Sequence, residues 1–258
     1  TRPASTLTSQ SPLPTTSIRS PSRLPNLNLL TAKQACMAID TLIFDFGGVI
    51  LDTETPDFET WRDVFREYGA DLDLAWWSQF IGGSSVNANA GIFGELEKLA
   101  GRPLDRDQIR ETRRARYLEI VAANPMLPGV MDYISQAKRL GLRLGIASSS
   151  NRAWVEGNLT ARGMISHFDS ISVSEDVSNV KPDPELYLLA ASRLGTWPEN
   201  ALAIEDSVNG VTAAKSAGMS CVAVPNPVTQ ALLFDHADLR VDSLSEMTLA
   251  SLIAVIGG

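Results

Sequence analysis

The sequence predicts an α/β protein, a doubly wound parallel sheet of Rossmann-like type with an inserted α-helical cap domain. Two observations support this: apolar runs that end in glycine or polar residues alternate with helical patterns, and one long stretch has no strand pattern at all. The strand-like runs lie at 41–50, 142–150, 169–176, 201–207 and 221–226. Strands that alternate with helices form a parallel sheet covered on both faces.

The stretch from 57 to 126 contains helical faces instead of strands. Its first apolar face combines Phe58, Trp61, Phe65 and Tyr68. Turn-forming segments bracket it at 52–56 and 124–129. We therefore predict an α/β core of residues 40–56 and 127–258 and a helical cap of residues 57–126, joined by linkers that can act as hinges.

Residues 1–39 differ from the rest in composition. They carry four basic side chains, no acidic ones, and many Ser, Thr and Pro residues. Such a segment cannot bury a core, so we expect a disordered leader. A basic, hydroxyl-rich, acid-free leader is typical of an organelle transit peptide, which predicts a chloroplast protein ahead of a mitochondrial one. The alternative is that translation starts at Met37, and then we expect a cytoplasmic protein.

Charge and composition exclude several classes of partner. The formal net charge is −8, which argues against binding to nucleic acid or to an anionic membrane. No apolar run approaches the length of a membrane span. The two cysteines, Cys36 and Cys221, lie far apart, so neither a disulfide framework nor a zinc cluster is expected. We expect a monomer whose partner is a small molecule.

Polar residues follow four separate segments of the predicted sheet region: Asp45, Ser148, Lys181 and the pair Glu205–Asp206. In such sheets, ligands bind outside the carboxyl ends of the strands, so these residues should converge. Acids gathered there repel one another unless a cation lies between them, and hard carboxylate oxygens favour Mg²⁺. A lysine and a hydroxyl beside an aspartate suit a phosphate.

Each of these residues also has a plain structural explanation. Asp45 could be a loop cap, Lys181 a solvated surface lysine, and Ser148 a cap of the next helix. The acids Glu205 and Asp206 could reflect the preference for negative charge at a helix N-terminus. The functional interpretation depends on their order and placement together.

That order resembles the haloacid dehalogenase-like hydrolase superfamily. The segment DFGGVILDTE (45–54) resembles its first motif and GIASSSN (145–151) its second. VKPDPELY (180–187) is similar to the third and AIEDSVNGVTAAKSAGM (203–219) to the fourth. The resemblance covers about 40–258, and the helical insert resembles the cap of the β-phosphoglucomutase-like and sugar-phosphate phosphatase subgroup.

The resemblance implies a Mg²⁺-dependent phosphatase of small phosphorylated metabolites such as sugar phosphates. Asp45 would be the nucleophile that forms an aspartyl-phosphate, with Ser148 and Lys181 holding the phosphoryl oxygens. The metal would be bound by Asp45, Asp206 and the carbonyl of Gly47, with help from Glu205. Further substrate contacts are expected from Ser149, Asn151 and Glu54.

One departure from the family pattern concerns Gly47, which lies where phosphatases of the family usually have a second aspartate as general acid and base. Such a group is typically worth about 10²–10⁴-fold in rate. Three interpretations are open: a slower phosphatase, a substitute acid such as Glu54 or Asp57, or a protein that binds phosphometabolites with little turnover. Dehalogenase and phosphonate hydrolase activities are disfavoured, because Gly47 is small and the only cap lysine is Lys98.

The Gly/Ser-rich segment 81–89 could turn toward the core or be a simple turn between helices. Mutases of the subgroup generally carry an arginine there and a histidine in the first hinge. This sequence has neither, and the hinge position is Asp57. Mutase activity is therefore disfavoured.

Overall fold

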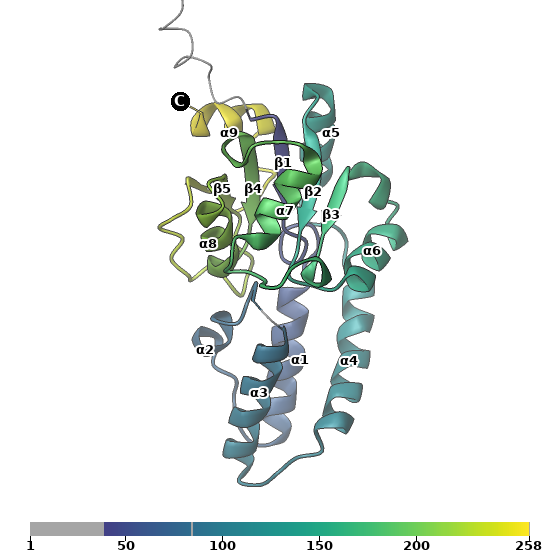
Figure 1. The fold of residues 1–258 in the computed structure, drawn as a ribbon. Coiled ribbons are helices and arrows are strands. Elements are labelled where there is room, and N and C mark those ends of the chain that lie inside the picture. The colour runs from purple at the N-terminus through teal and green to yellow at the C-terminus, as the bar shows by residue number, and fades with distance from the viewer. Residues whose placement is uncertain (1–38, 84, 258) are drawn as a thin grey trace, which may run out of the picture. The chain divides into compact units, whose positions relative to one another are not determined.

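A parallel sheet of six strands forms the centre of the α/β part of the molecule (Figure 1). The computed structural model describes residues 39–83 and 85–257, without the side chains of 85–89. The strand order is β3-β2-β1-β4-β5-β6, and every pair is parallel. The strands are β1 (Thr41–Phe44), β2 (Arg143–Ala147), β3 (Ser170–Ser172), β4 (Ala201–Glu205), β5 (Ser220–Ala223) and β6 (Leu239–Arg240).

The fold class predicted from the sequence is confirmed. Five strands lie within or at the edge of the predicted runs, whereas β6 has only two residues and no apolar run to signal it. The α-helices are α1 (Glu54–Glu67), α2 (Leu74–Ser78), α3 (Ser85–Ala100), α4 (Arg106–Ala123), α5 (Val130–Leu140), α6 (Arg152–Ala161), α7 (Glu185–Leu194), α8 (Val208–Ser216) and α9 (Leu249–Ile256).

Successive residues of each central strand face two different helical layers. Leu42 and Phe44 of β1 belong to a buried cluster with residues of α5, α6 and α9. Ile43, between them, belongs to a second cluster with residues of α7 and α8. Because both faces are covered, the strands consist of continuous apolar runs rather than alternating ones.

The helices α1–α4, which we call the helical insert, follow β1 and precede α5 (Figure 1). Helices α1–α3 and their connections form a buried cluster, built around Trp61, Phe65 and Phe93. Among the described residues, Val228 is the buried member of this cluster that comes from outside the insert. The insert thus has an apolar core of its own, while the end of α4 packs against the sheet region, because Tyr117 and Val121 belong to the cluster of the first sheet face.

The predicted leader falls almost wholly outside the described residues, since only Ile39 of it is described. Its disorder, the transit-peptide interpretation and the alternative start at Met37 therefore stay predictions, as does the monomeric state. Within residues 39–83 and 85–257, no helix is both long and apolar enough to cross a membrane. Cys221 is a buried free thiol.

Candidate active site

The carboxyl ends of three central strands bring predicted site residues to one edge of the sheet. β1 pairs in aligned parallel register with both β2 and β4. Asp45 directly follows β1, Ser148 directly follows β2, and Glu205 and Asp206 lie at the end of β4. All four side chains are buried. The parallel topology is thus what collects residues more than a hundred positions apart in the chain.

Lys181 joins this group from the loop that precedes α7. Its Nζ donates hydrogen bonds to Asp45 Oδ1 at 2.5 Å, Glu205 Oε1 at 2.6 Å and the Ala147 carbonyl at 2.7 Å. The Lys181 side chain is fully buried, which excludes a solvated surface lysine. The ammonium therefore holds the Asp45 carboxylate in place at the end of β1.

The acids of this edge carry more negative charge than Lys181 can balance. Burial raises the pKa of Asp45 to about 7, with Lys181 opposing the rise and Glu205 adding to it. Burial and then the charge of Asp45 raise the pKa of Asp206 well above its usual range. Burial would lower the pKa of Lys181, but Asp45 and Glu205 raise it, so the lysine stays charged. A cation placed among these carboxylates would relieve the excess.

Both carboxylate oxygens of Glu205 accept hydrogen bonds from protein groups. Its Oε1 accepts from Lys181 and from the Tyr187 hydroxyl at 2.6 Å, and its Oε2 accepts from the backbone N–H of Asp206 at 3.2 Å. A Cβ at Gly210 would lie 2.0 Å from its carboxylate, so only glycine lets α8 approach so closely. These contacts make Glu205 the partner that positions Lys181.

Asp206 lies against the loop that follows β1 and the loop that follows β5. A Cβ at Gly48 would lie 1.9 Å from Asp206 Oδ2, and the φ of Gly48 is +74°. This position therefore requires glycine for two reasons, the lack of space and the left-handed backbone. Asn226, after β5, donates from Nδ2 to the same oxygen at 2.6 Å. Asp206 is therefore oriented by groups from two other segments.

Gly47 borders a space that the first turn of α1 already fills. A Cβ at Gly47 would lie 2.6 Å from Thr53 Oγ1 and 2.9 Å from Glu54 Oε1. Thr53 donates its hydroxyl to Glu54 Oε1 at 3.0 Å. Burial first, and then the charge of Asp57, raises the pKa of Glu54 to about 8. A protonatable carboxyl group thus stands where the missing side chain at position 47 would point.

The loop from Ser148 to Asn151 connects β2 to α6. Ser148 Oγ accepts from the Ser150 N–H at 3.2 Å, and Ser149 Oγ donates to the Gly82 carbonyl at 2.8 Å. Asn151 caps α6 by accepting from the Trp154 N–H at 2.8 Å. Ser148, Ser149 and Asn151 all line the same cavity as Asp45. The contact with Gly82 also shows that the start of segment 81–89 meets the core.

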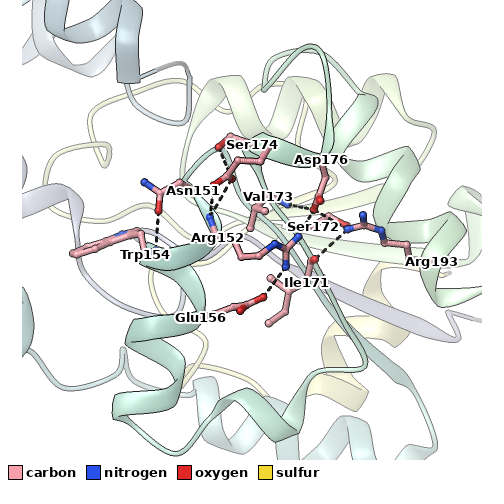
Figure 2. A network of polar contacts seen from close by, with 11 residues as sticks. Asn151, Arg152, Trp154, Glu156, Ile171, Ser172, Val173, Ser174, Asp176 and Arg193 are labelled. Carbon is pink, nitrogen blue, oxygen red and sulfur yellow. Dashed lines mark hydrogen bonds and ion pairs between the residues drawn. The ribbon is translucent and has the colours of Figure 1, made fainter.

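A network of ion pairs lies next to the end of this loop, beginning at Arg152 (Figure 2). Asp176 Oδ2 accepts from Arg152 at 2.7 Å, from Arg193 at 2.8 Å and from the Val173 N–H at 3.0 Å. Arg152 also donates to Glu156 at 2.6 Å (Figure 2). The network joins the start of α6 to the end of β3 and to α7, so it fixes the backbone that carries Ser148–Asn151.

A cavity of about 280 Å³ extends from Asp45 and Asp206 toward the helical insert. Glu54, Gly47 and the Ser148–Asn151 loop line its inner part. The aromatic side chains in its wall are Trp61, Trp77, Phe80, Tyr117 and Trp154. Tyr117 and Trp154 are stacked, with ring centroids 5.5 Å apart. The outer cavity thus offers flat apolar surfaces.

Asp57, the other candidate for a substitute acid, forms an ion pair within the helical insert. It accepts from Arg113 Nη1 at 2.5 Å, and Arg113 also lies over the Trp61 ring at 4.5 Å. Arg113 belongs to α4, so this ion pair joins two helices of the insert. Glu54 is therefore the better-placed acid of the two.

Sequence reasoning missed Asn226 and the arginines Arg113 and Arg152. Asn226 had a usable signal, because it follows an apolar strand run in the same way as Asp45 and Ser148 do. The arginines had none for their contacts with other segments, since Asp57 and Asp176, which accept from Arg113 and Arg152, lie more than twenty residues away in the chain.

The chain belongs to the haloacid dehalogenase-like hydrolases: the model of the family described as "Haloacid dehalogenase-like hydrolase" matches residues 42–224. The predicted class of enzyme is thereby confirmed. YhcW of Bacillus subtilis, provisionally named a phosphatase, is 46% identical over 215 residues, which are 83% of this chain and 96% of that protein.

Two further relatives place the chain within the family. Hexitol phosphatase B of Escherichia coli is 32% identical over 213 residues, covering 82% of this chain and 95% of that protein. The crystal structure of β-phosphoglucomutase from Clostridium difficile matches with a TM-score of 0.68 and 26% identity, over 84% of this chain and 97% of that one. These likenesses agree with the subgroup that the helical insert indicated.

Proposed function

We propose that this protein is a Mg²⁺-dependent phosphatase that hydrolyses small phosphorylated metabolites of the sugar-phosphate kind, with Asp45 as nucleophile. The observation that carries the proposal is the contact of Lys181 with Asp45 at the inner end of a cavity that Asp206 also lines. The relatives support the substrate class, since one is named a hexitol phosphatase.

The reaction would proceed in two steps. A carboxylate oxygen of Asp45 forms a bond to phosphorus while the ester P–O bond breaks, and the leaving oxygen takes up a proton. Water then attacks the aspartyl-phosphate, which releases inorganic phosphate and restores Asp45. Lys181 and Ser148 hold the phosphoryl oxygens, and Ser149 and Asn151 contact the substrate. Positioning and charge stabilisation carry most of such a reaction.

The residues present fit a Mg²⁺ ion. Asp45, Asp206 and the Gly47 carbonyl are hard oxygen donors in a site with excess negative charge. The residues that the structure describes include no cluster of three or more acidic, His or Cys side chains ready to hold a metal. Mg²⁺ needs none, since it usually binds one or two carboxylates and keeps waters and substrate oxygens. Glu205, already bound to Lys181 and Tyr187, would contribute indirectly. When bound, the ion neutralises phosphoryl charge.

Glu54 is the group we assign to proton transfer in place of an aspartate at position 47. Its carboxyl lies beside Gly47 and lines the cavity with Asp45. Its raised pKa suits an acid that can donate and take back a proton near neutral pH. The loss of the usual aspartate would then be offset by the first turn of α1.

The helical insert would act as the cap of the active site. We propose the division made from the sequence, with residues 57–126 as cap and residues 40–56 and 127–258 as core. The supporting observations are the separate apolar cluster of the insert and the aromatic wall that it contributes to the cavity. Substrate choice would then depend on the insert.

A panel of phosphate esters assayed with Mg²⁺ and with EDTA tests the proposal. We expect metal-dependent release of phosphate, lost in Asp45→Asn. Gly47 favours a second candidate, a protein that binds phosphometabolites and turns them over little. Saturable binding of a substrate without Mg²⁺-dependent hydrolysis of any panel member would support that candidate and overturn ours.

A further inference from the structure

The loop after β5 contacts both the helical insert and the acid end of β4. Asn226 and Val228 lie two residues apart in it and are both buried. Asn226 Nδ2 donates to Asp206 Oδ2 at 2.6 Å. Val228 belongs to the apolar cluster of the insert, where it is the one described member from outside α1–α3 and their connections. A single short segment therefore joins two parts of the active site.

The asparagine closes the turn of this segment through its own hydrogen bonds. Asn226 Oδ1 accepts from the N–H groups of Val228 at 3.0 Å and Thr229 at 3.2 Å. The Asn226 N–H donates to Thr229 Oγ1 at 3.0 Å. The two ends of the Asn226 amide thus have separate tasks: the oxygen closes the turn that presents Val228, and the nitrogen holds Asp206. A shift of Val228 moves the atom that orients the carboxylate.

We propose that Asn226 is a positioning residue for the Mg²⁺-binding carboxylate of Asp206, and that Val228 couples its position to the seating of the helical insert. This inference rests on the proposed function, since it assigns Asp206 to the metal. An amide held against one carboxylate oxygen fixes the direction of the other, which a cation requires. When the insert packs on Val228, Asp206 is aligned; when it departs, the alignment loosens.

Calorimetric titration of the full chain with Mg²⁺ tests the first part without relying on activity. Asn226→Ser keeps an oxygen that can close the turn but is too short to reach Asp206. We expect the Mg²⁺ dissociation constant to rise about 10-fold, the lower end of losses seen for outer-shell partners of metal ligands. Asn226→Ala serves as a second variant, and thermal unfolding verifies that each variant is folded.

A double-mutant cycle tests the coupling. Val228→Ala should raise the Mg²⁺ dissociation constant about 3-fold in the wild-type background and have no effect in Asn226→Ser, because it acts through the asparagine. The matched control is Val64→Ala, which removes the same methyl groups from the same cluster away from the loop. It should leave Mg²⁺ binding unchanged.

The outcomes separate the two proposals. Wild-type protein that binds no Mg²⁺ and hydrolyses no ester contradicts the proposed function. Wild-type protein that binds and hydrolyses, with Asn226→Ser binding Mg²⁺ equally well, contradicts the role of Asn226 alone. The coupling through Val228 is contradicted if Val228→Ala weakens Mg²⁺ binding in Asn226→Ser as much as in the wild type. It is also contradicted if Val64→Ala weakens Mg²⁺ binding as much as Val228→Ala does.

Discussion

The inner and outer halves of the cavity are lined by side chains of different chemical character. The inner half is lined by the acids Asp45, Asp206 and Glu54, and the Lys181 ammonium, buried outside this lining, is bonded to Asp45 and Glu205. The outer half consists of aromatic rings and arginines, and most of them come from the helical insert. Strand ends in a packed sheet move little, whereas helices joined by two linkers can shift as a unit.

This difference indicates a division of labour between chemistry and selection. The inner half can hold a phosphoryl group in one geometry, which phosphoryl transfer requires. The outer half offers flat apolar faces that suit the carbon skeleton of a substrate. Variants of the inner half should therefore act on turnover, and variants of the outer half on substrate saturation.

The largest effect is expected from Asp45→Asn. Removal of the nucleophile should lower kcat by at least about 10³-fold, measured as phosphate release with saturating Mg²⁺. Asp235→Asn, which changes an exposed aspartate, is the matched control and should retain full activity. An Asp45→Asn variant with wild-type turnover would exclude the aspartyl-phosphate route.

Glu54→Gln should have the next largest effect. Loss of the proton donor should lower kcat about 10²-fold on alkyl phosphates and much less on aryl phosphates, whose leaving groups need little protonation. Equal losses on both substrate types would show that Glu54 only binds the substrate.

Substitution of Gly47 provides a second test of the role of Glu54. Glu54→Ala should lower the rate on alkyl phosphates, and Gly47→Asp should raise the rate more in that variant than in the wild type, because the new side chain then meets only Thr53 in a space that Thr53 and Glu54 share. A gain in Gly47→Asp alone as large as in the double variant would contradict this explanation.

A substitution in the outer half of the cavity should have a smaller effect, and it should act on KM rather than on kcat. Trp154→Ala removes one of the two stacked rings and should raise KM about 5-fold with kcat nearly unchanged. Trp197→Ala, at a tryptophan that is 72% exposed, is the control. If Trp154→Ala lowers kcat more than it raises KM, the division between the two halves is wrong.

The smallest effect is expected from the ion-pair network of Asp176, next to the Ser148–Asn151 loop. Hydrogen bonds from Arg193 and Arg152, with that from the Val173 N–H, outweigh burial and hold the pKa of Asp176 well below its usual range. Its stabilisation is therefore present above the ordinary aspartate pKa and lost as the pH falls through the lowered one.

Asp176→Asn should lower the free energy of unfolding by about 1 kcal/mol at neutral pH, measured by urea denaturation. The difference from wild type should shrink as the pH falls below about 4. A constant difference at every pH would show that the charge of Asp176 contributes nothing.

Much of the fold could be predicted because its signals are local. Each central strand is a continuous apolar run, and Asp45, Glu205 and Asp206 lie at the end of such a run. The two-residue strand β6 lacked that signal. Asn226 shows the limit at the site: its place after a strand was visible, but its contact with Asp206 depends on how β5 packs beside β4.

The sequence by itself determined the sheet, the helical insert and the set of polar residues at the strand ends, because periodicity and strand termini are properties of neighbouring residues. Only the tertiary structure decided which groups meet. Glu54 fills the space beside Gly47 since α1 begins there, and Asp57 is held by Arg113 from a helix more than fifty residues away. Contacts of that kind depend on packing between segments, which no local pattern records.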